Sequence, residues 1–151
     1  MPISVESRPR LPGVAAPLRA LVAAALALEG GRPGDITVLL ADDPALRALN
    51  QRWRGIDRAT DVLSFLYAER RDQRIDGDLA ISLERMGEQA KRYRVTRGRE
   101  LARLVVHGAL HLAGLDHHGT AERAHMRRRE QRALRAGAVH IRKLDRALAR
   151  A

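Results

Sequence analysis

The residues best suited to chemistry in this sequence are three histidines that fall within eleven positions. His107 and His111 are four residues apart, and His117 follows a glycine at position 114. Side chains four residues apart lie on one face of a helix, with Cβ atoms about 5–6 Å apart. Neutral imidazole is the commonest protein ligand for zinc, and three protein ligands with an open fourth position are typical of catalytic zinc. We therefore predict that His107, His111 and His117 bind one Zn²⁺ per chain.

The first two histidines belong to a predicted helix over 101–113. Its apolar residues recur at spacings of three and four, as expected for a helix with one buried face. Gly114 is placed to end the helix in a left-handed conformation, after which His117 can turn back toward the same ion. A single histidine on such a face is more often a core residue, but three in this arrangement favour a metal. The chain has no cysteine, which excludes a structural site closed by thiolates.

The neighbouring polar residues have secondary roles in this interpretation. We expect Asp116 to orient a ligand imidazole as a hydrogen-bond acceptor. His118 is expected to be a solvated neighbour, and His125 and His140 to be surface residues.

The residue after the first histidine argues against proteolysis. The spacing His-x3-His-x2-Gly-x2-His is that of long zinc-protease motifs, in which a glutamate general base follows the first histidine. Here that position is Gly108. A metal would still lower the pKa of a bound water to about 7 and polarise a phosphoryl oxygen, so phosphodiester hydrolysis remains open.

The distribution of charge indicates a polyanionic partner. The net charge is +10; residues 1–84 carry 11 basic and 12 acidic side chains, whereas residues 85–151 carry 17 basic and 6 acidic ones. A GC-rich genome would favour arginine over lysine. It would not by itself place the excess of basic side chains in the half of the chain that contains the histidine motif. The helices around 85–103 and 120–135 are therefore predicted to form a cationic surface that suits a polyanionic partner, with nucleic acid first among the candidates.

The 151 residues, 45% of them hydrophobic, predict one α+β domain with a small mixed β-sheet of about four strands packed with about five helices. No apolar run is long enough to span a membrane, and nothing at the N-terminus is typical of a signal peptide.

Residues 1–137 are expected to form the domain and 138–151 a basic tail able to form a helix. The expected strands are 3–7, 36–41, 61–67 and 78–81, and the expected helices are 17–29, 44–53, 83–94, 97–113 and 120–136. Leu46, Leu49 and Trp53 are expected on the buried side of the second helix.

A second polar stretch, 49–65, lies at a junction between helix and strand. Arg54 is placed at the end of the helix, where its guanidinium could bind a phosphate and stabilise charge in phosphoryl transfer. Alternatively, Arg54 could favour the helix dipole or pair with Asp57 or Asp61. Thr60 and Ser64 could contact substrate, although such hydroxyls more often satisfy the local backbone. Asp78 is expected to be a structural hydrogen-bond acceptor.

Three segments together resemble the YbeY family of bacterial endoribonucleases. They are the histidine motif of 107–117, the Leu-Asn-x3-Arg-x5-Thr-Asp-Val-Leu-Ser-Phe segment of 49–65, and Gly-Asp-Leu-Ala-Ile-Ser at 77–82. The resemblance extends over about 3–136. The family often has proline before the threonine, where this chain has Ala59, a difference that touches no proposed chemistry.

The resemblance implies that His107, His111 and His117 hold zinc and that Arg54 acts on the substrate phosphate. It also implies a cytoplasmic enzyme that cuts single-stranded RNA, matures the 3′ end of small-subunit (16S) rRNA and acts in ribosome quality control. RNA and the small ribosomal subunit are then the expected partners, with no specificity for DNA and no membrane. Two alternatives stay open: a non-catalytic RNA-binding assembly factor with a structural metal, and a metal-dependent hydrolase of another substrate.

Overall fold

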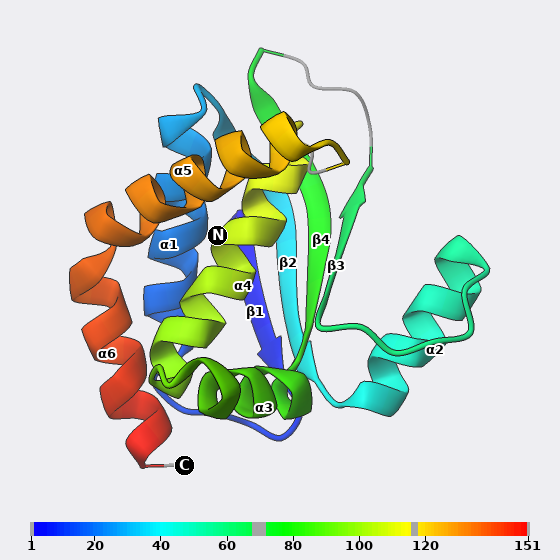
Figure 1. Cartoon of the computed structure of the whole chain (residues 1–151), viewed down its shortest axis with the longest axis vertical. Helices are drawn as coiled ribbons and strands as arrows, with labels where there is room; N and C mark the ends of the chain where they lie inside the picture. The colour runs from blue at the N-terminus through cyan, green and yellow to red at the C-terminus, as the bar shows by residue number, and fades with distance from the viewer. Residues whose placement is uncertain (1, 68–71, 116–117, 151) are drawn as a thin grey trace.

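A four-stranded mixed sheet forms the centre of the fold (Figure 1). The computed structural model describes residues 2–67, 72–115 and 118–150. The strands are arranged in the order β1-β2-β4-β3. Three of them are parallel, and β3 pairs antiparallel with β4 at one edge. The strands are β1 (Ile3–Ser7), β2 (Arg32–Ala41), β3 (Val62–Leu66) and β4 (Arg74–Ser82). The α+β prediction with a small mixed sheet is confirmed.

The helices cover the two faces of this sheet unequally. In Figure 1, α1 and α4 lie along one face with α5 and α6 outside them, α3 lies at one end, and α2 projects on the other side. The helices are α1 (Ala15–Leu28), α2 (Asp43–Arg54), α3 (Leu83–Tyr93), α4 (Arg97–Leu112), α5 (Thr120–Ala136) and α6 (Ala138–Ala149).

Helix starts and stops follow from local sequence. The side chains of Asp42, Ser82 and Thr96 accept hydrogen bonds from backbone N–H groups at the starts of α2, α3 and α4, at 3.0, 3.2 and 3.1 Å. Such caps satisfy donors that have no partner within the helix. After α4, Gly114 has φ +101°, which confirms the left-handed helix end.

The core lies mainly between the sheet and the α1–α4 layer. Along β2, the side chains of Ile36, Val38 and Leu40 point into this core, because alternate residues of a strand face opposite sides. A smaller cluster on the other face joins Ala41, Leu46, Leu63 and Ala80 beneath α2. The first face is therefore closed, whereas the second is covered only where α2 begins.

Four features differ from the sequence-based expectations. β2 begins at Arg32 and not at 36, because Arg32 and Pro33 also pair with β4. β4 begins at Arg74 and not at 78, because 74–77 continue the pairing with β2. Residues 138–149 form a sixth helix, whose buried Ile141, Leu144 and Leu148 belong to the main core. The expectation that Trp53 is buried is wrong, since it is 62% exposed. The apolar spacing continues to Trp53, but α2 has only its first turns against the sheet (Figure 1).

Two glycines allow α4 to lie close to the sheet. A Cβ atom at Gly108 would lie 2.8 Å from Leu79 Cδ2 and 3.4 Å from Val62 Cγ2. On the strand side, a Cβ atom at Gly77 would lie 2.5 Å from the carbonyl oxygen of Phe65 and 2.9 Å from Leu112 Cδ2. The position that carries a glutamate in zinc proteases therefore faces the sheet in this protein, and a larger side chain there would require Leu79 or α4 to shift.

We predict that Gly108→Ala destabilises the fold although alanine favours helices. Overpacking of a core typically costs about 1–3 kcal/mol, which exceeds the roughly 0.5–1 kcal/mol gained in helix propensity. Gly87→Ala on α3 is the matched control, because its added Cβ would meet nothing within 4 Å. Denaturant unfolding should give a lower free energy of unfolding for Gly108→Ala and a higher one for Gly87→Ala. Equal gains in both variants would contradict the close-packing explanation.

Candidate metal centre and active site

His107 and His111 line one cavity at the C-terminal end of α4. The cavity has a volume of about 610 Å³ and lies between α4 and β3. The two imidazole centroids are 4.8 Å apart, and both residues are half-buried. The predicted spacing on one helix face is therefore confirmed for this pair, and both side chains line the same cavity.

The third predicted ligand, His117, lies outside the described residues, as does Asp116. Within 2–67, 72–115 and 118–150, no three His, Asp or Glu side chains are grouped so that they alone could hold a metal. The described part of the chain thus places two of the three predicted ligands on α4, and metal binding by all three histidines stays a prediction. His118 is exposed and lines the same cavity.

A buried carboxylate on α5 fixes the first histidine. Glu130 is 9% exposed and its Oε1 forms a short hydrogen bond with Nδ1 of His107. Metal-binding histidines commonly donate one ring N–H to a carboxylate, which fixes the tautomer and the ring orientation. Ligation by His107 would accordingly use Nε2. The residues present therefore fit a zinc ion by donor type, by spacing and by this supporting bond.

An arginine on α4 pairs with a second buried carboxylate of this region. Arg103 forms two hydrogen bonds with the buried Glu100, at 2.9 and 2.7 Å. The hydrogen bond to Glu100 raises the pKa of Arg103, and the nearby charges of Glu130 and Asp61 act in the same direction. Arg103 thus pairs with Glu100 and also lies close enough to Glu130 for the two charges to attract.

Arg54 reaches the cavity from the last turn of α2. Its Nη2 donates to the backbone oxygen of Ser64 at 2.9 Å, and its guanidinium lies 5.3 Å from the centroid of the Phe65 ring. The alternative pairings are not observed, since Asp57 accepts from Arg47 and Asp61 accepts from Gln89. The structure thus places Arg54 and the two histidines on the wall of one cavity.

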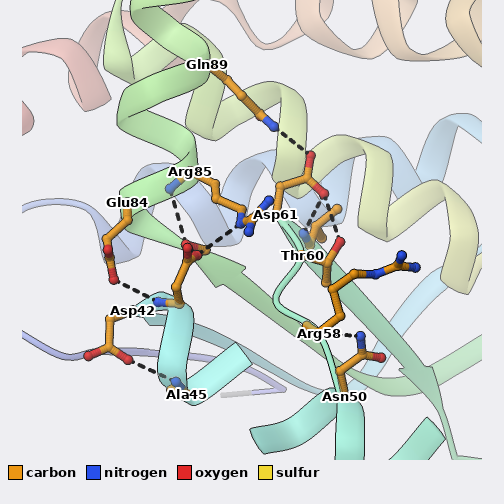
Figure 2. A network of polar contacts seen from close by, with 12 residues as sticks. Asp42, Ala45, Asn50, Arg58, Thr60, Asp61, Glu84, Arg85 and Gln89 are labelled. Atoms are coloured by element: carbon orange, nitrogen blue, oxygen red, sulfur yellow. Dashed lines mark hydrogen bonds and ion pairs between the residues drawn. The ribbon is translucent and has the colours of Figure 1, made fainter. Parts of the chain in front are cut away.

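A polar network holds the loop that carries the cavity wall (Figure 2). Asp61 accepts from the backbone N–H of Val62 at 2.8 Å and from Gln89 Nε2 at 3.1 Å. Asn50 Nδ2 donates to the carbonyl of Arg58 at 2.9 Å. These bonds link α2, the loop 55–61 and α3, so Asp61 has a structural role.

The hydroxyls near the cavity also serve the fold. Ser64 Oγ donates to the carbonyl of Gly108 at 3.4 Å, and Thr60 Oγ1 donates to Asp61 at 3.4 Å. Asp78 accepts from the Tyr67 hydroxyl, as expected of a structural acceptor.

Comparison with known proteins identifies the family. The sequence model described as "Endoribonuclease YbeY" matches residues 15–137. The chain belongs to the YbeY endoribonuclease family. It is 48% identical over 113 residues to endoribonuclease YbeY of Roseiflexus sp. (strain RS-1), covering 69% of this chain and 71% of that protein. It is 44% identical over 108 residues to the Carboxydothermus hydrogenoformans YbeY protein, covering 72% and 76%.

A solved structure supports the same conclusion about the fold. The solution structure of TM1509 from Thermotoga maritima is similar with a TM-score of 0.59 and 25% identity, covering 94% of this chain and 88% of that one. The YbeY resemblance inferred from the three motifs is therefore confirmed at the level of sequence and fold.

Sequence reasoning missed one member of this YbeY site, Glu130. A signal was present, because the buried residues of α5 are Met126, Glu130, Ala133 and Leu134, which are spaced as one helix face. A carboxylate within an otherwise apolar stripe needs a partner, since burial of an unpaired charge is costly. The partner, His107, could be identified only once α5 was placed against α4.

We predict that Glu130→Gln weakens zinc binding by about 10- to 100-fold, the usual effect of losing a partner that orients a metal ligand. Competition with a zinc chelator would measure the affinity without any activity assay. Glu122→Gln, an exposed change on the same helix, should leave the affinity unchanged. Unaltered zinc binding in Glu130→Gln would show that the contact is structural only.

Proposed function

We propose that this protein is a zinc-dependent endoribonuclease that cuts single-stranded RNA, with a role in 3′-end maturation of 16S rRNA and in ribosome quality control. The observation that carries the proposal is that His107, His111 and Arg54 line one cavity in a chain of the YbeY family. A metal-ligand pair beside a guanidinium is the donor set that phosphodiester hydrolysis needs.

The proposed metal ligands are His107, His111 and His117. Zinc held there would supply an acidified water as nucleophile and a Lewis acid for the phosphoryl oxygen. The protein's part is to fix the ligands: α4 sets the spacing of the first two, and Glu130 holds His107 by Nδ1. The missing protease glutamate does not weaken this assignment, since residue 108 packs on Leu79 and cannot reach the cavity.

Arg54 is proposed to bind the scissile phosphate. A guanidinium has five N–H donors, and only one bond is made to the Ser64 carbonyl. The remaining donors suit a phosphate, and the positive charge would stabilise the extra negative charge of the transition state. The hydrogen bond to Ser64 and the contact with the Phe65 ring hold the guanidinium in place. The Arg54 side chain therefore needs little change of conformation before reaction.

The α5 arginines extend the cationic surface away from the cavity. Arg123 and Arg127 line a hollow of about 170 Å³ that also contains His107 and Glu130. Both arginines are exposed and are proposed to contact the RNA backbone. In contrast, Arg97 begins α4, ten residues or about 15 Å along the axis from His107, and its Nη2 donates to Leu148 in α6. Arg103 lines the same hollow as the α5 arginines, but the start of α4 is less well placed than α5.

Selectivity for a single strand suits a recessed site. The histidines are half-buried within a cavity, so a reacting phosphate must approach closely, and a flexible strand enters more easily than a stacked duplex. The ribosomal small subunit is the proposed source of the RNA, in the cytoplasm, with no specificity for DNA. In the described part of the chain, no helix has the length and apolarity that crossing a bilayer requires.

We predict that Arg54→Ala lowers the rate of single-stranded RNA cleavage about 100-fold, as for removal of other transition-state donors, while zinc content stays near one per chain. His111→Ala should lower both zinc content and cleavage. Element analysis and a cleavage assay on the same preparations would measure the two effects. Arg58→Ala is the matched control, because Arg58 lies in the adjoining loop but lines a different surface hollow.

The alternatives give different results in this experiment. A non-catalytic assembly factor would bind RNA and zinc but would not cut RNA in any form. A hydrolase of another substrate would cut a peptide or a small phosphoester faster than RNA. Cleavage that is equal in Arg54→Ala and the unmodified protein would contradict the phosphate role.

We also predict that RNA binding weakens with salt and that the α5 arginines contribute to this dependence. For single strands, a plot of the logarithm of the binding constant against the logarithm of the salt concentration has a negative slope. Each phosphate contact contributes about 0.7 to the size of that slope. Replacing Arg123 and Arg127 by alanine should therefore reduce the slope by roughly 1.4. The same change at Arg142 and Arg146 on α6, which packs toward the start of α4, should reduce it less. Fluorescence anisotropy over a salt series would provide the slopes.

A further inference from the structure

An aromatic groove lies on the second face of the sheet, where α2 leaves the strands uncovered. Its volume is about 520 Å³. Trp53 and Tyr67 line it and are 62% and 61% exposed, and Phe65 lines it from β3. Exposed apolar side chains that gather in one hollow are a common mark of a binding site, whereas single ones are not.

This groove and the catalytic cavity meet at the edge of β3 through one shared lining residue. Leu66 lines both hollows. Arg54 lines the catalytic cavity, while its guanidinium lies over Phe65, which lines the groove. A chain bound at Arg54 would need to pass only this edge to reach the aromatic rings.

The edge itself is open along β3. The backbone N–H of Tyr67 donates to the backbone oxygen of Asp76 in the neighbouring strand. Along one strand of an antiparallel pair, alternate residues bond to the partner strand, and the residues between them direct their backbone groups the other way. Ser64 and Leu66 therefore direct their backbone groups away from β4. The bond from Arg54 to the Ser64 carbonyl agrees with this direction. The rim between the two hollows therefore contains polar backbone groups and the Arg54 guanidinium beside the exposed side chain of Leu66.

The charges are arranged for a nucleotide rather than for a phosphate alone. Arg54 lines the neighbouring cavity, and the guanidinium of Arg52 lies 5.0 Å from the centroid of the Trp53 ring. Inside the groove are the carboxylates of Asp78 and Glu6. Cations beside the groove suit phosphates, and carboxylates beside aromatic rings suit the amino groups of a nucleobase. The hydrogen bond to Asp78 raises the pKa of Tyr67 to about 12, so the phenol stays neutral.

We propose that this groove binds a nucleobase of the RNA strand next to the scissile phosphate, stacked on Trp53, with the adjoining phosphates at Arg52 and Arg54. The inference rests on the proposed function, because the strand enters from the catalytic cavity. It explains why Trp53 is exposed although it follows the apolar spacing of α2. A peptide docked on the same face would use the rings but would give no role to these two arginines.

The single tryptophan of the chain reports directly on the proposal. Since the sequence contains one Trp, intrinsic tryptophan fluorescence comes from Trp53 alone. A ten-nucleotide single-stranded RNA added to the full-length His111→Ala protein, to limit cleavage, should quench this fluorescence, whereas inorganic phosphate should not. Binding measured by anisotropy without a change in Trp53 fluorescence would overturn the stacking.

Substitution tests the contribution to affinity. Trp53→Ala should weaken RNA binding about tenfold, within the range found for one stacked base, and Trp53→Phe should restore most of the loss. Val139→Ala, which shortens an exposed apolar side chain on α6 (44% exposed), is the control and should not change the affinity. Unchanged RNA affinity in Trp53→Ala would assign the groove to a different partner, such as a protein, and overturn the proposal.

The carboxylates provide a test of base preference. Cytosine carries an amino donor where uracil has an oxygen, so oligocytidine should bind more tightly than oligouridine, and Asp78→Asn should reduce the difference. Equal binding of the two would overturn the role of Asp78.

The outcomes distinguish this inference from the proposed function. If zinc-loaded protein cuts RNA but Trp53 neither responds to RNA nor affects affinity, the groove proposal fails and the nuclease stands. If Trp53 is quenched by RNA that the zinc-loaded protein never cuts, the groove binds RNA and the nuclease proposal fails.

Discussion

The close approach of α4 to the β3–β4 edge is the constraint on which the site depends. Gly108 and Gly77 leave room for this approach, with Leu79 and Leu112 filling the contact. As a result, His107 and His111 open into the same cavity as the β3 wall and Arg54. A side chain at position 108 would require the buried Leu79 side chain or the helix itself to shift. The same glycine thus removes the protease base and permits the geometry that phosphodiester chemistry uses.

The site is assembled from elements that are distant in sequence, and polar contacts fix the position of each element. Glu130 of α5 holds a histidine of α4, and Arg54 of α2 is tied to β3. The loop between α2 and β3 is anchored through Asp61 to α3 (Figure 2). These bonds are made before substrate arrives, which agrees with catalysis by preorganised charge. The aromatic groove then continues the same wall to the other face of the sheet.

Local signals made most of the fold predictable. The N-caps at Asp42, Ser82 and Thr96 mark helix starts because each side chain accepts a hydrogen bond from a nearby backbone N–H group. These contacts are local in sequence, so they can be predicted without knowing the tertiary structure. The i, i+4 spacing of His107 and His111 similarly fixes their common face. Arg54 needed the family resemblance, because its alternatives could be separated only by the structure.

Features that depend on tertiary packing could not be predicted. The partner of Glu130 follows from how α5 crosses α4 (Figure 1). The exposure of Trp53 follows from how far α2 extends past the sheet, which its own apolar spacing does not encode. The steric reason for Gly108 likewise required knowledge of which strand side chains lie opposite it.

The central claim is that zinc at the α4 histidines drives cleavage of single-stranded RNA beside Arg54. It is tested most directly by removing metal from the purified protein with a chelator and adding zinc back in measured amounts while RNA cleavage is followed. The account predicts that cleavage disappears with the metal and returns to a plateau at one zinc per chain, with single-stranded RNA cut in preference to duplex. Full cleavage by the metal-free protein, or none at any zinc content, would contradict it.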